Sequence, residues 1–176
     1  MDLIVFTNGA TSVAGEAFGD GDGSTTAFSA TAANTGIAPG TLTATDGTET
    51  FTDNADGTLT GSASGTGTVN YRTGAVTLTF NAAPATGTGN ITISYDYLAE
   101  NKMPNSPYPT NLGFRAEGAA VALIVSISDD GVNWQQHTAG TVPAWGFKSI
   151  GVVPQPHLDV RASAKGRLLG GPVNAT

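Results

Sequence analysis

The stretch that decides the fold is AVTLTFNAAPATGTGNITISYDYL, residues 75–98. In its first part, 75–81, and in its last part, 90–98, apolar residues alternate with polar ones. The apolar members are Val76, Leu78, Phe80, Ile91, Ile93, Tyr95 and Tyr97. A period of two is typical of an antiparallel strand with one buried and one solvated face. The intervening ATGTGN (85–90) is rich in turn residues, so the stretch predicts two strands joined by a turn.

The same period extends in both directions from this stretch. Towards the N-terminus it marks strands at residues 41–46, 48–54, 58–63 and 68–73, separated by turn signals such as TDGT and NADGT. We therefore expect residues 12–98 to form a meander of roughly seven strands. Towards the C-terminus it marks strands at 119–130, 131–138, 147–153, 157–164 and 166–173. No segment has helical periodicity, and the predicted fold class is all-β.

A proline-rich segment divides the chain. AENKMPNSPYPTNLG (99–113) contains Pro104, Pro107 and Pro109. Because proline removes a ladder donor, this segment is expected to be a linker or an extended arm rather than a central strand. The predicted organisation is two small antiparallel β-sandwich or barrel modules, residues 1–98 and 115–176, joined by a Pro-rich linker at 99–114.

Composition excludes several classes of partner. The formal net charge is −7 and the isoelectric point about 4.4, and an acidic chain gains nothing from neutralising phosphates, so we expect no nucleic acid partner. No stretch approaches the roughly 20 apolar residues of a membrane span. The start, MDLIVFTNG, lacks the features of a signal peptide, which favours assembly in a cytoplasm. The absence of cysteine excludes disulfides and thiolate sites.

The acidic stretch GDGDGSTT (19–26) could be a calcium loop, a phosphate-binding loop or a turn. Counted from Asp20, Thr25 stands where a calcium loop needs glycine and Thr31 where it needs a bidentate glutamate. The lysine of a phosphate-binding loop is missing, and two aspartates would repel the phosphate. The turn interpretation is therefore favoured.

The sequence shows no constellation for catalysis. His137 and His157 are expected on different strands, and no Gly-x-Ser-x-Gly elbow occurs. Most acidic residues stand beside glycine in turns, and nothing selects a carboxylate pair for glycoside hydrolysis. We therefore expect a protein that is not an enzyme and has no catalytic residues, no cofactor and no metal.

The two tryptophans have different contexts. Trp134 follows a predicted hairpin in SDDGVNW (128–134), where it could be a core residue or an aromatic platform for a sugar. Trp145 lies in TVPAWGF (141–147), a loop with proline and glycine, and is the better candidate for an exposed contact.

Residues 18–97 resemble a β module of virion structural proteins of tailed bacteriophages. The motifs that carry the resemblance are GDGSTTxF, xDGTETFTDxxDGTLTG and xGTVNYxTGAVTLTFNxAP. The stretch ALIVSISDDGVNW (122–134) is similar to small sandwiches that occur in phage decoration proteins and in carbohydrate-binding discoidin-like domains. The resemblance implies an all-β structural protein of the virion.

From this resemblance we expect a capsid decoration or cement protein, assembled in the host cytoplasm and located in the virion. One module would bind the major capsid protein and contact copies of itself, which would make the chain a homo-oligomer, while the other module projects. One alternative is a minor tail, baseplate or fibre-adaptor protein. Another is a module that binds a host glycan during adsorption.

Two segments are candidates for the interface. The apolar run Leu3, Ile4, Val5 and Phe6 is expected to pair with a sheet, either in the second module or in a neighbouring chain; a first strand within its own domain is the alternative. The segment 101–114 carries three isolated large side chains that fit grooves on another subunit. These are Met103, Tyr108 and Phe114, and Trp145 completes the predicted set of interface residues.

Overall fold

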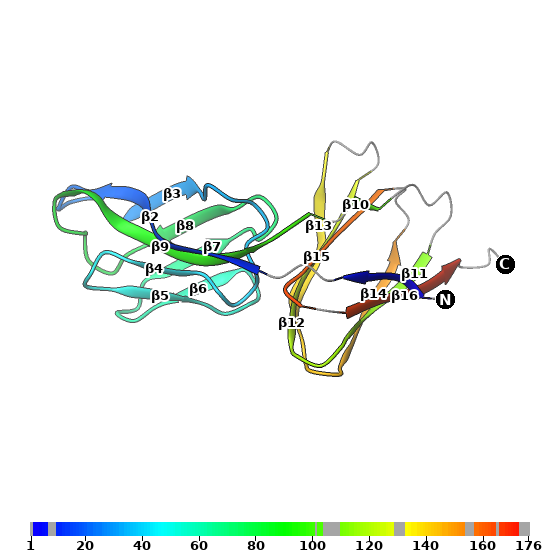
Figure 1. The fold of residues 1–176 in the computed structure, drawn as a ribbon. Helices are drawn as coiled ribbons and strands as arrows, with labels where there is room; N and C mark the ends of the chain where they lie inside the picture. The colour runs from blue at the N-terminus through cyan, green and yellow to red at the C-terminus, as the bar shows by residue number, and fades with distance from the viewer. Residues whose placement is uncertain are drawn as a thin grey trace. The chain divides into compact units, whose positions relative to one another are not determined.

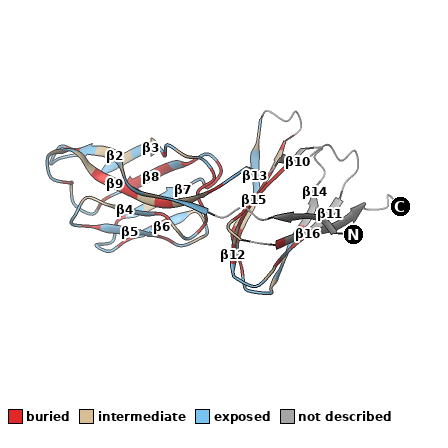
Figure 2. Ribbon diagram, viewed as in Figure 1, coloured by how far each residue is buried: buried red, intermediate tan, exposed pale blue. Residues whose placement is uncertain are grey.

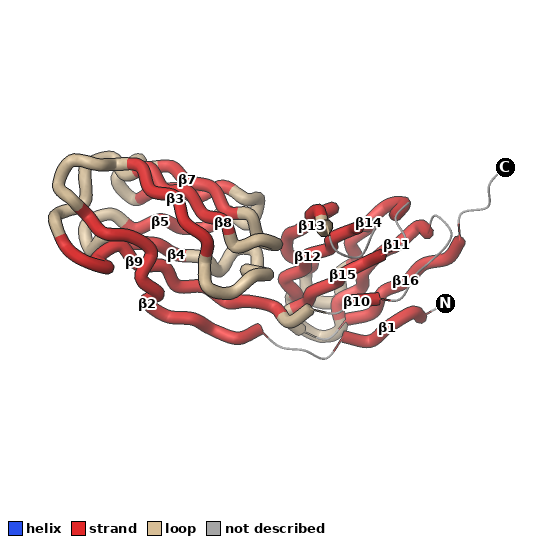
Figure 3. Tube along the Cα trace, turned by 90° about the horizontal axis from the view of Figure 1, so that it is seen from above, coloured by secondary structure: helices blue, strands red, loops and turns tan. Residues whose placement is uncertain are grey.

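The computed structural model describes residues 2–6, 10–100, 102–103, 110–128, 133–153, 157–164 and 166–172. Throughout these residues the regular structure is β-strand, with no helix (Figure 3). The prediction of an all-β, antiparallel fold is confirmed. Within the same residues there is consequently no helix long and apolar enough to cross a membrane.

The chain forms two compact units (Figure 1). Unit 1 comprises residues 1–10 and 98–176, and unit 2 comprises residues 11–97. Unit 2 is thus inserted after the first strand of unit 1, since β1 (Asp2–Phe6) pairs antiparallel with β16 (Gly166–Pro172). The expected boundary put residues 1–98 in one module. It differs from the structure because period-two alternation identifies a strand and says nothing about its partner.

Unit 2 contains one eight-stranded antiparallel sheet that is nearly closed, like a barrel. Its strands are β2 (Ala10–Gly21), β3 (Ala27–Thr31), β4 (Thr43–Thr45), β5 (Thr50–Asp53), β6 (Thr58–Gly61), β7 (Thr66–Val69), β8 (Ala75–Thr79) and β9 (Gly87–Leu98). The spatial order is β2-β9-β4-β5-β6-β7-β8-β3. Strands β4 to β8 form the expected meander. Strand β3, however, pairs with β8, and β9 returns to pair with β4.

Alternating burial builds the core of unit 2 (Figure 2). In β8, Val76 and Leu78 are buried, while the residues between and beside them are exposed. Just beyond β8, Phe80 packs edge-to-face against Phe28 and Phe51, with ring centroids 5.8 and 4.9 Å away. Such T-shaped aromatic pairs contribute about 1 kcal/mol each beyond their buried area.

The strand expected at 68–73 ends earlier than the alternation indicates. Strand β7 ends at Val69, and the side-chain Oδ1 of Asn70 accepts the backbone N–H groups of Arg72 and Thr73 at 3.1 and 3.0 Å. Asparagine favours such local turns over a ladder. Tyr71 is nevertheless buried. The turn therefore keeps the apolar residue on the inner face, and this alternation is what predicted a strand.

A buried hydrogen-bond pair joins this turn to the sheet. The hydroxyl of Tyr71 donates to Oδ1 of Asp53 at 2.6 Å and accepts the N–H of Gly57 at 2.9 Å. The other carboxylate oxygen of Asp53 accepts the N–H of Gly40 at 2.6 Å. Burial and the bond to Asp53 raise the pKa of Tyr71, so its hydroxyl remains a donor.

Unit 1 contains two four-stranded antiparallel sheets. Their orders are β1-β16-β11-β14 and β10-β15-β12-β13. The strands not yet given are β10 (Lys102–Met103), β11 (Thr110–Ala116), β12 (Val121–Ser128), β13 (Gln135–Val142), β14 (Phe147–Val153) and β15 (His157–Ala162). Residues from both sheets form one buried cluster, as in a sandwich. Its members are Phe114, Ala116, Val121, Leu123, Val125, Val142, Ile150, Leu158, Val160 and Ala162.

The expected linker at 99–114 contains two of these strands. Strand β10 pairs with β15, and β11 is central, between β16 and β14. A proline removes only its own donor, so a ladder can begin at Thr110 directly after Pro109. Pro104, Pro107 and Pro109 themselves lie outside the described residues.

The Tyr71 pair can be tested by Tyr71→Phe. Removing the hydroxyl leaves the N–H of Gly57 without this acceptor and removes one of the three donors of the buried Asp53 carboxylate, so we expect the free energy of unfolding to fall by about 1–3 kcal/mol. Chemical denaturation followed by circular dichroism measures this. The matched control is Tyr97→Phe, because Tyr97 is half-buried and its hydroxyl makes no hydrogen bond to a described residue. Equal losses in both variants would show that the Tyr71 bonds contribute nothing.

Candidate binding site

The turn between β13 and β14 carries the most unusual residue of the described chain. The N–H of Gly146 donates to the carbonyl of Pro143 at 2.8 Å, which closes a β-turn. Trp145 occupies its third position with a φ of 58°. Turns that need a positive φ at this position normally use glycine.

This conformation costs free energy. Left-handed backbone disfavours residues with a Cβ by about 1–2 kcal/mol. Most residues with a positive φ in this chain are glycines. Within the described residues, the only non-glycine residues with a positive φ are Ala55, Ser64 and Trp145. Strain of this kind persists where a side chain must be held in a set direction, and it is a reason to look for a functional role.

Trp145 and Phe147 are also exposed. Their exposed fractions are 67 % and 60 %, and the described residues show no other large hydrophobic side chains exposed to this degree. The two residues stand two positions apart on one short segment, where the turn leads into β14.

The side chain of Phe147 lies on the outer face of its sheet. Its cross-strand partner is Arg115 of β11, which is exposed, whereas Phe114 and Ala116 on the other face are buried in the core. A Cβ added to Gly113 would overlap the ring of Phe147. The ring therefore lies over Gly113, and the missing side chain there makes room for it.

Arg115 completes this surface. Cross-strand partners share a face of the sheet, with Cβ atoms about 5 Å apart, so the side chains of Arg115 and Phe147 leave the sheet on the same face. The guanidinium group of Arg115 makes no hydrogen bond or ion pair with another described residue. The neighbouring Lys148, by contrast, donates from Nζ to the carbonyl of Ala139 at 3.0 Å. We call Arg115, Trp145 and Phe147 the turn patch.

The side chains of the turn patch can contact another molecule, but none of them is a group for nucleophilic or acid–base chemistry. Two aromatic faces supply apolar contact, and a guanidinium group supplies planar donors for a carboxylate or carbonyl oxygen.

The structure places the expected interface residues in different environments. Leu3, Ile4, Val5 and Phe6 form β1, which pairs with β16 of the same chain, one of the alternatives foreseen. Their side chains, and that of Met103 in β10, lie outside the described part of the structure, and Tyr108 lies outside it entirely. Trp145 is exposed, as its loop indicates.

Phe114 was expected in an exposed arm and is instead fully buried in the core of unit 1. Alternation explains the correction, because β11 is a central strand and Phe114 lies on its inner face. Gly166 allows this packing, since a Cβ there would overlap the Phe114 ring. A neighbouring subunit therefore has no access to this side chain.

Phe147 and Arg115 were not among the expected site residues, although the sequence held a signal for the first. In FKSIGVV (147–153), Phe147 alternates in step with Ser149 and Gly151, whereas Ile150 marks the buried face. A phenylalanine in step with small and polar residues indicates an outward position. For Arg115 only the pairing of β11 with β14 reveals the neighbour.

Trp134 lies just before β13 and is half-buried. It does not belong to the buried cluster of unit 1. Trp134 is therefore not part of this core, and it does not belong to the turn patch either.

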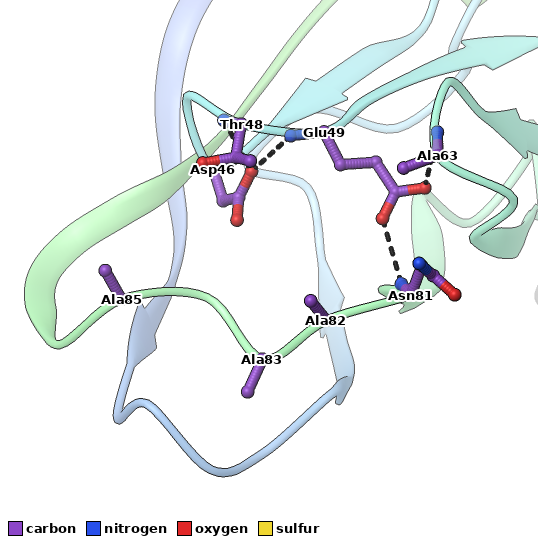
Figure 4. A pocket seen from close by; sticks show the side chains of 8 residues that line it. All are labelled: Asp46, Thr48, Glu49, Ala63, Asn81, Ala82, Ala83 and Ala85. Atoms are coloured by element: carbon purple, nitrogen blue, oxygen red, sulfur yellow. Dashed lines mark hydrogen bonds between the residues drawn. The ribbon is translucent and has the colours of Figure 1, made fainter.

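Unit 2 contains a cavity of about 200 Å³ lined by two acidic residues (Figure 4). Its lining consists of Asp46, Thr48, Glu49, Ala63, Asn81, Ala82, Ala83 and Ala85. Both carboxylates are already bonded to the backbone. Oδ1 of Asp46 accepts the N–H groups of Thr48 and Glu49 at 2.8 and 2.7 Å, which closes a turn.

Glu49 is the more deeply buried of the two. Its Oε1 accepts the N–H groups of Gly65 and Ala63 at 2.7 and 3.2 Å, and its Oε2 accepts that of Asn81 at 2.9 Å. Three backbone donors thus hold this carboxylate in place. Both acidic residues of the lining thus bind backbone N–H groups and have a structural role.

The GDGDGSTT stretch is a turn that uses its own carboxylate. Oδ1 of Asp22 accepts the N–H groups of Ser24 and Thr25 at 2.8 and 2.6 Å, and Oδ2 accepts the Thr25 hydroxyl. These bonds hold the pKa of Asp22 well below its usual range. Across the described residues, no three His, Asp or Glu side chains gather where they could hold a metal ion.

Comparisons with known proteins assign no relative to this chain. No family model, no curated protein and no solved structure matches it.

The cavity interpretation predicts the effect of Glu49→Gln. An amide can replace one acceptor oxygen, but its NH₂ group would face a backbone donor, so we expect a loss of about 1–3 kcal/mol in the free energy of unfolding. Asp20→Asn removes the same charge from an exposed side chain with one bond, to the N–H of Gly89, and should cost less. A fully stable Glu49→Gln variant would contradict the structural role.

The strained turn predicts that Trp145→Gly changes stability little. Glycine adopts the left-handed conformation freely, which offsets the lost contacts of a largely exposed ring, and we expect a change within about 1 kcal/mol. The control is Phe114→Ala, which removes a buried ring and should cost about 3–5 kcal/mol. Thermal unfolding compares them. A loss in Trp145→Gly as large as in the control would mean that the indole is packed against the body of the unit.

Proposed function

We propose that this chain is a structural protein of a virus particle, a capsid decoration or cement protein that binds the major capsid protein and stabilises the head. The resemblance of residues 18–97 to a β module of tailed-phage virion proteins supports the proposal. The turn patch is the observation that carries it, since two exposed aromatic rings on a strained turn are built for contact.

The distribution of charge supports attachment through unit 1. Unit 2 (residues 11–97) contains eight acidic residues and one basic residue, a net charge of −7. Unit 1 (residues 1–10 and 98–176) contains six of each, a net charge of zero. The whole charge of the chain thus belongs to the unit without the turn patch. A neutral unit with apolar surface suits a contact, and a strongly acidic unit suits solvent.

A decoration protein of this kind acts by binding. Any partner that binds the intact shell and not its dissociated state stabilises the shell by mass action, in proportion to the logarithm of its concentration relative to the dissociation constant. The chain needs no chemistry for this role, and a rigid β scaffold that presents one contact surface is sufficient.

Particles assembled without this chain should lose heat and osmotic resistance relative to complete particles. Release of packaged nucleic acid during a temperature ramp measures the effect, and adding back the purified chain is the control that should restore resistance. Equal resistance in both kinds of particle would overturn the cement role.

The number of copies per particle decides the location. Quantitative gel densitometry of purified virions should show copies in proportion to the major capsid protein. A few copies per particle would instead favour a minor tail, baseplate or fibre-adaptor protein, and absence from purified virions would overturn the proposed function.

A further inference from the structure

We infer that the turn patch is a hot spot for docking to a protein, and that its partner surface holds an apolar pocket for Trp145 and Phe147 bordered by a carboxylate that pairs with Arg115. The inference rests on the proposed function, because it takes the partner to be the capsid surface, and it names the residues and the chemistry of the contact.

The residue types of the patch are those of a protein interface. Tryptophan, phenylalanine and arginine are enriched at the centres of such interfaces, and truncating a central tryptophan or arginine commonly causes the largest losses of affinity. Here Arg115 and Phe147 lie in one sheet, and Trp145 lies in the turn that leads into it. Arg115 and Phe147 are cross-strand partners, and the N–H of Ala116 donates to the carbonyl of Gly146, directly after Trp145, at 3.0 Å.

The unpaired guanidinium group indicates the charge of the partner. The chain has 14 acidic and 7 basic residues, yet none of the described acidic side chains pairs with Arg115. The buried Arg161 shows the alternative, with bonds to Asp159 at 3.1 Å and Glu100 at 2.6 Å. An exposed arginine on the same sheet face as an exposed phenylalanine, with no ion pair to a described residue, is suited to a bidentate bond with a carboxylate of another molecule.

The patch is arranged before any partner arrives. The hydrogen bond across the turn fixes the backbone of Trp145, and Gly113 provides the seat beneath the ring of Phe147. Ordering a flexible side chain at an interface lowers the affinity, because rotamer freedom is lost. The fixed backbone of Trp145 and the placed ring of Phe147 avoid part of that cost.

The same features favour a protein over a saccharide. The three side chains of the patch supply apolar surface and N–H donors but no strong acceptor, since arginine only donates. Sugar hydroxyls donate as well as accept, and would leave donors unmatched here. A carboxylate beside an apolar pocket needs only what the patch supplies.

The test uses the full chain and particles assembled without it. Co-sedimentation over a range of protein concentrations gives the dissociation constant for each variant. We expect Trp145→Gly to weaken binding at least about 30-fold, the size of a hot-spot loss. Arg115→Gln should weaken it about tenfold and reduce its dependence on salt, because a charge pair is lost. Arg115→Lys retains the charge without the planar fork and should bind between the two.

Two further variants separate the contact from the fold. Gly113→Ala retains the identity of all three patch residues but its Cβ would displace the Phe147 ring, so it should weaken binding although no contacting residue is replaced. Ala55→Gly relieves the same backbone strain in unit 2, where φ is 64°, and should bind as the unmodified chain does. Thermal unfolding of each variant confirms that a loss of binding is not a loss of structure.

The outcomes are distinct. Weakened binding by folded Trp145 and Arg115 variants supports the inference. If the unmodified chain binds particles and these variants bind equally well, the inference is wrong while the proposed function stands. If the unmodified chain neither occurs in virions nor binds particles, the proposed function fails, and the capsid docking site fails with it. If a glycan array detects a saccharide whose binding Trp145→Gly abolishes, the site takes a sugar, and the protein partner is wrong.

Discussion

A β-strand with one apolar face must bury that face against other strands, and in the described part of this chain no helix is available to cover a sheet. The two units meet this constraint in different ways. Unit 2 curls a single eight-stranded sheet until it nearly closes, so its strands cover one another. Unit 1 packs two four-stranded sheets around a shared cluster of buried residues. The positions of the turns, the buried polar groups and the turn patch all follow from these arrangements.

Curling a sheet creates corners where backbone donors lose their ladder partners, and buried donors without partners are costly. Unit 2 supplies carboxylates at such places. Glu49 accepts three backbone N–H groups, and Asp53 accepts two along with the hydroxyl of Tyr71. Part of the acidic character of the unit is therefore structural, and these carboxylates are committed to the fold rather than to a ligand.

Unit 1 holds an exposed tryptophan in a conformation that glycine would adopt without strain; the other two such residues, Ala55 and Ser64 of unit 2, have small side chains. The turn adds exposed apolar surface next to an exposed arginine, and neither feature stabilises the unit by itself. Sites where local rules are broken without a local gain are those where function is expected. The net charge of zero of the same unit means that a partner approaching it meets no excess of like charge.

The sequence by itself determined the all-β class, most strand positions and the exposure of Trp145, because alternation and turn residues act over a few neighbouring positions. It did not determine that β1 pairs with β16, that β11 is a central strand, or that Phe114 faces inward. Pairing joins residues far apart in the chain, and a period of two is identical for every possible partner. The turn patch depends on such a pairing, since only the alignment of β11 with β14 places Arg115 and Gly113 beside Phe147. Tertiary structure therefore decided the site, while local sequence decided the strands that build it.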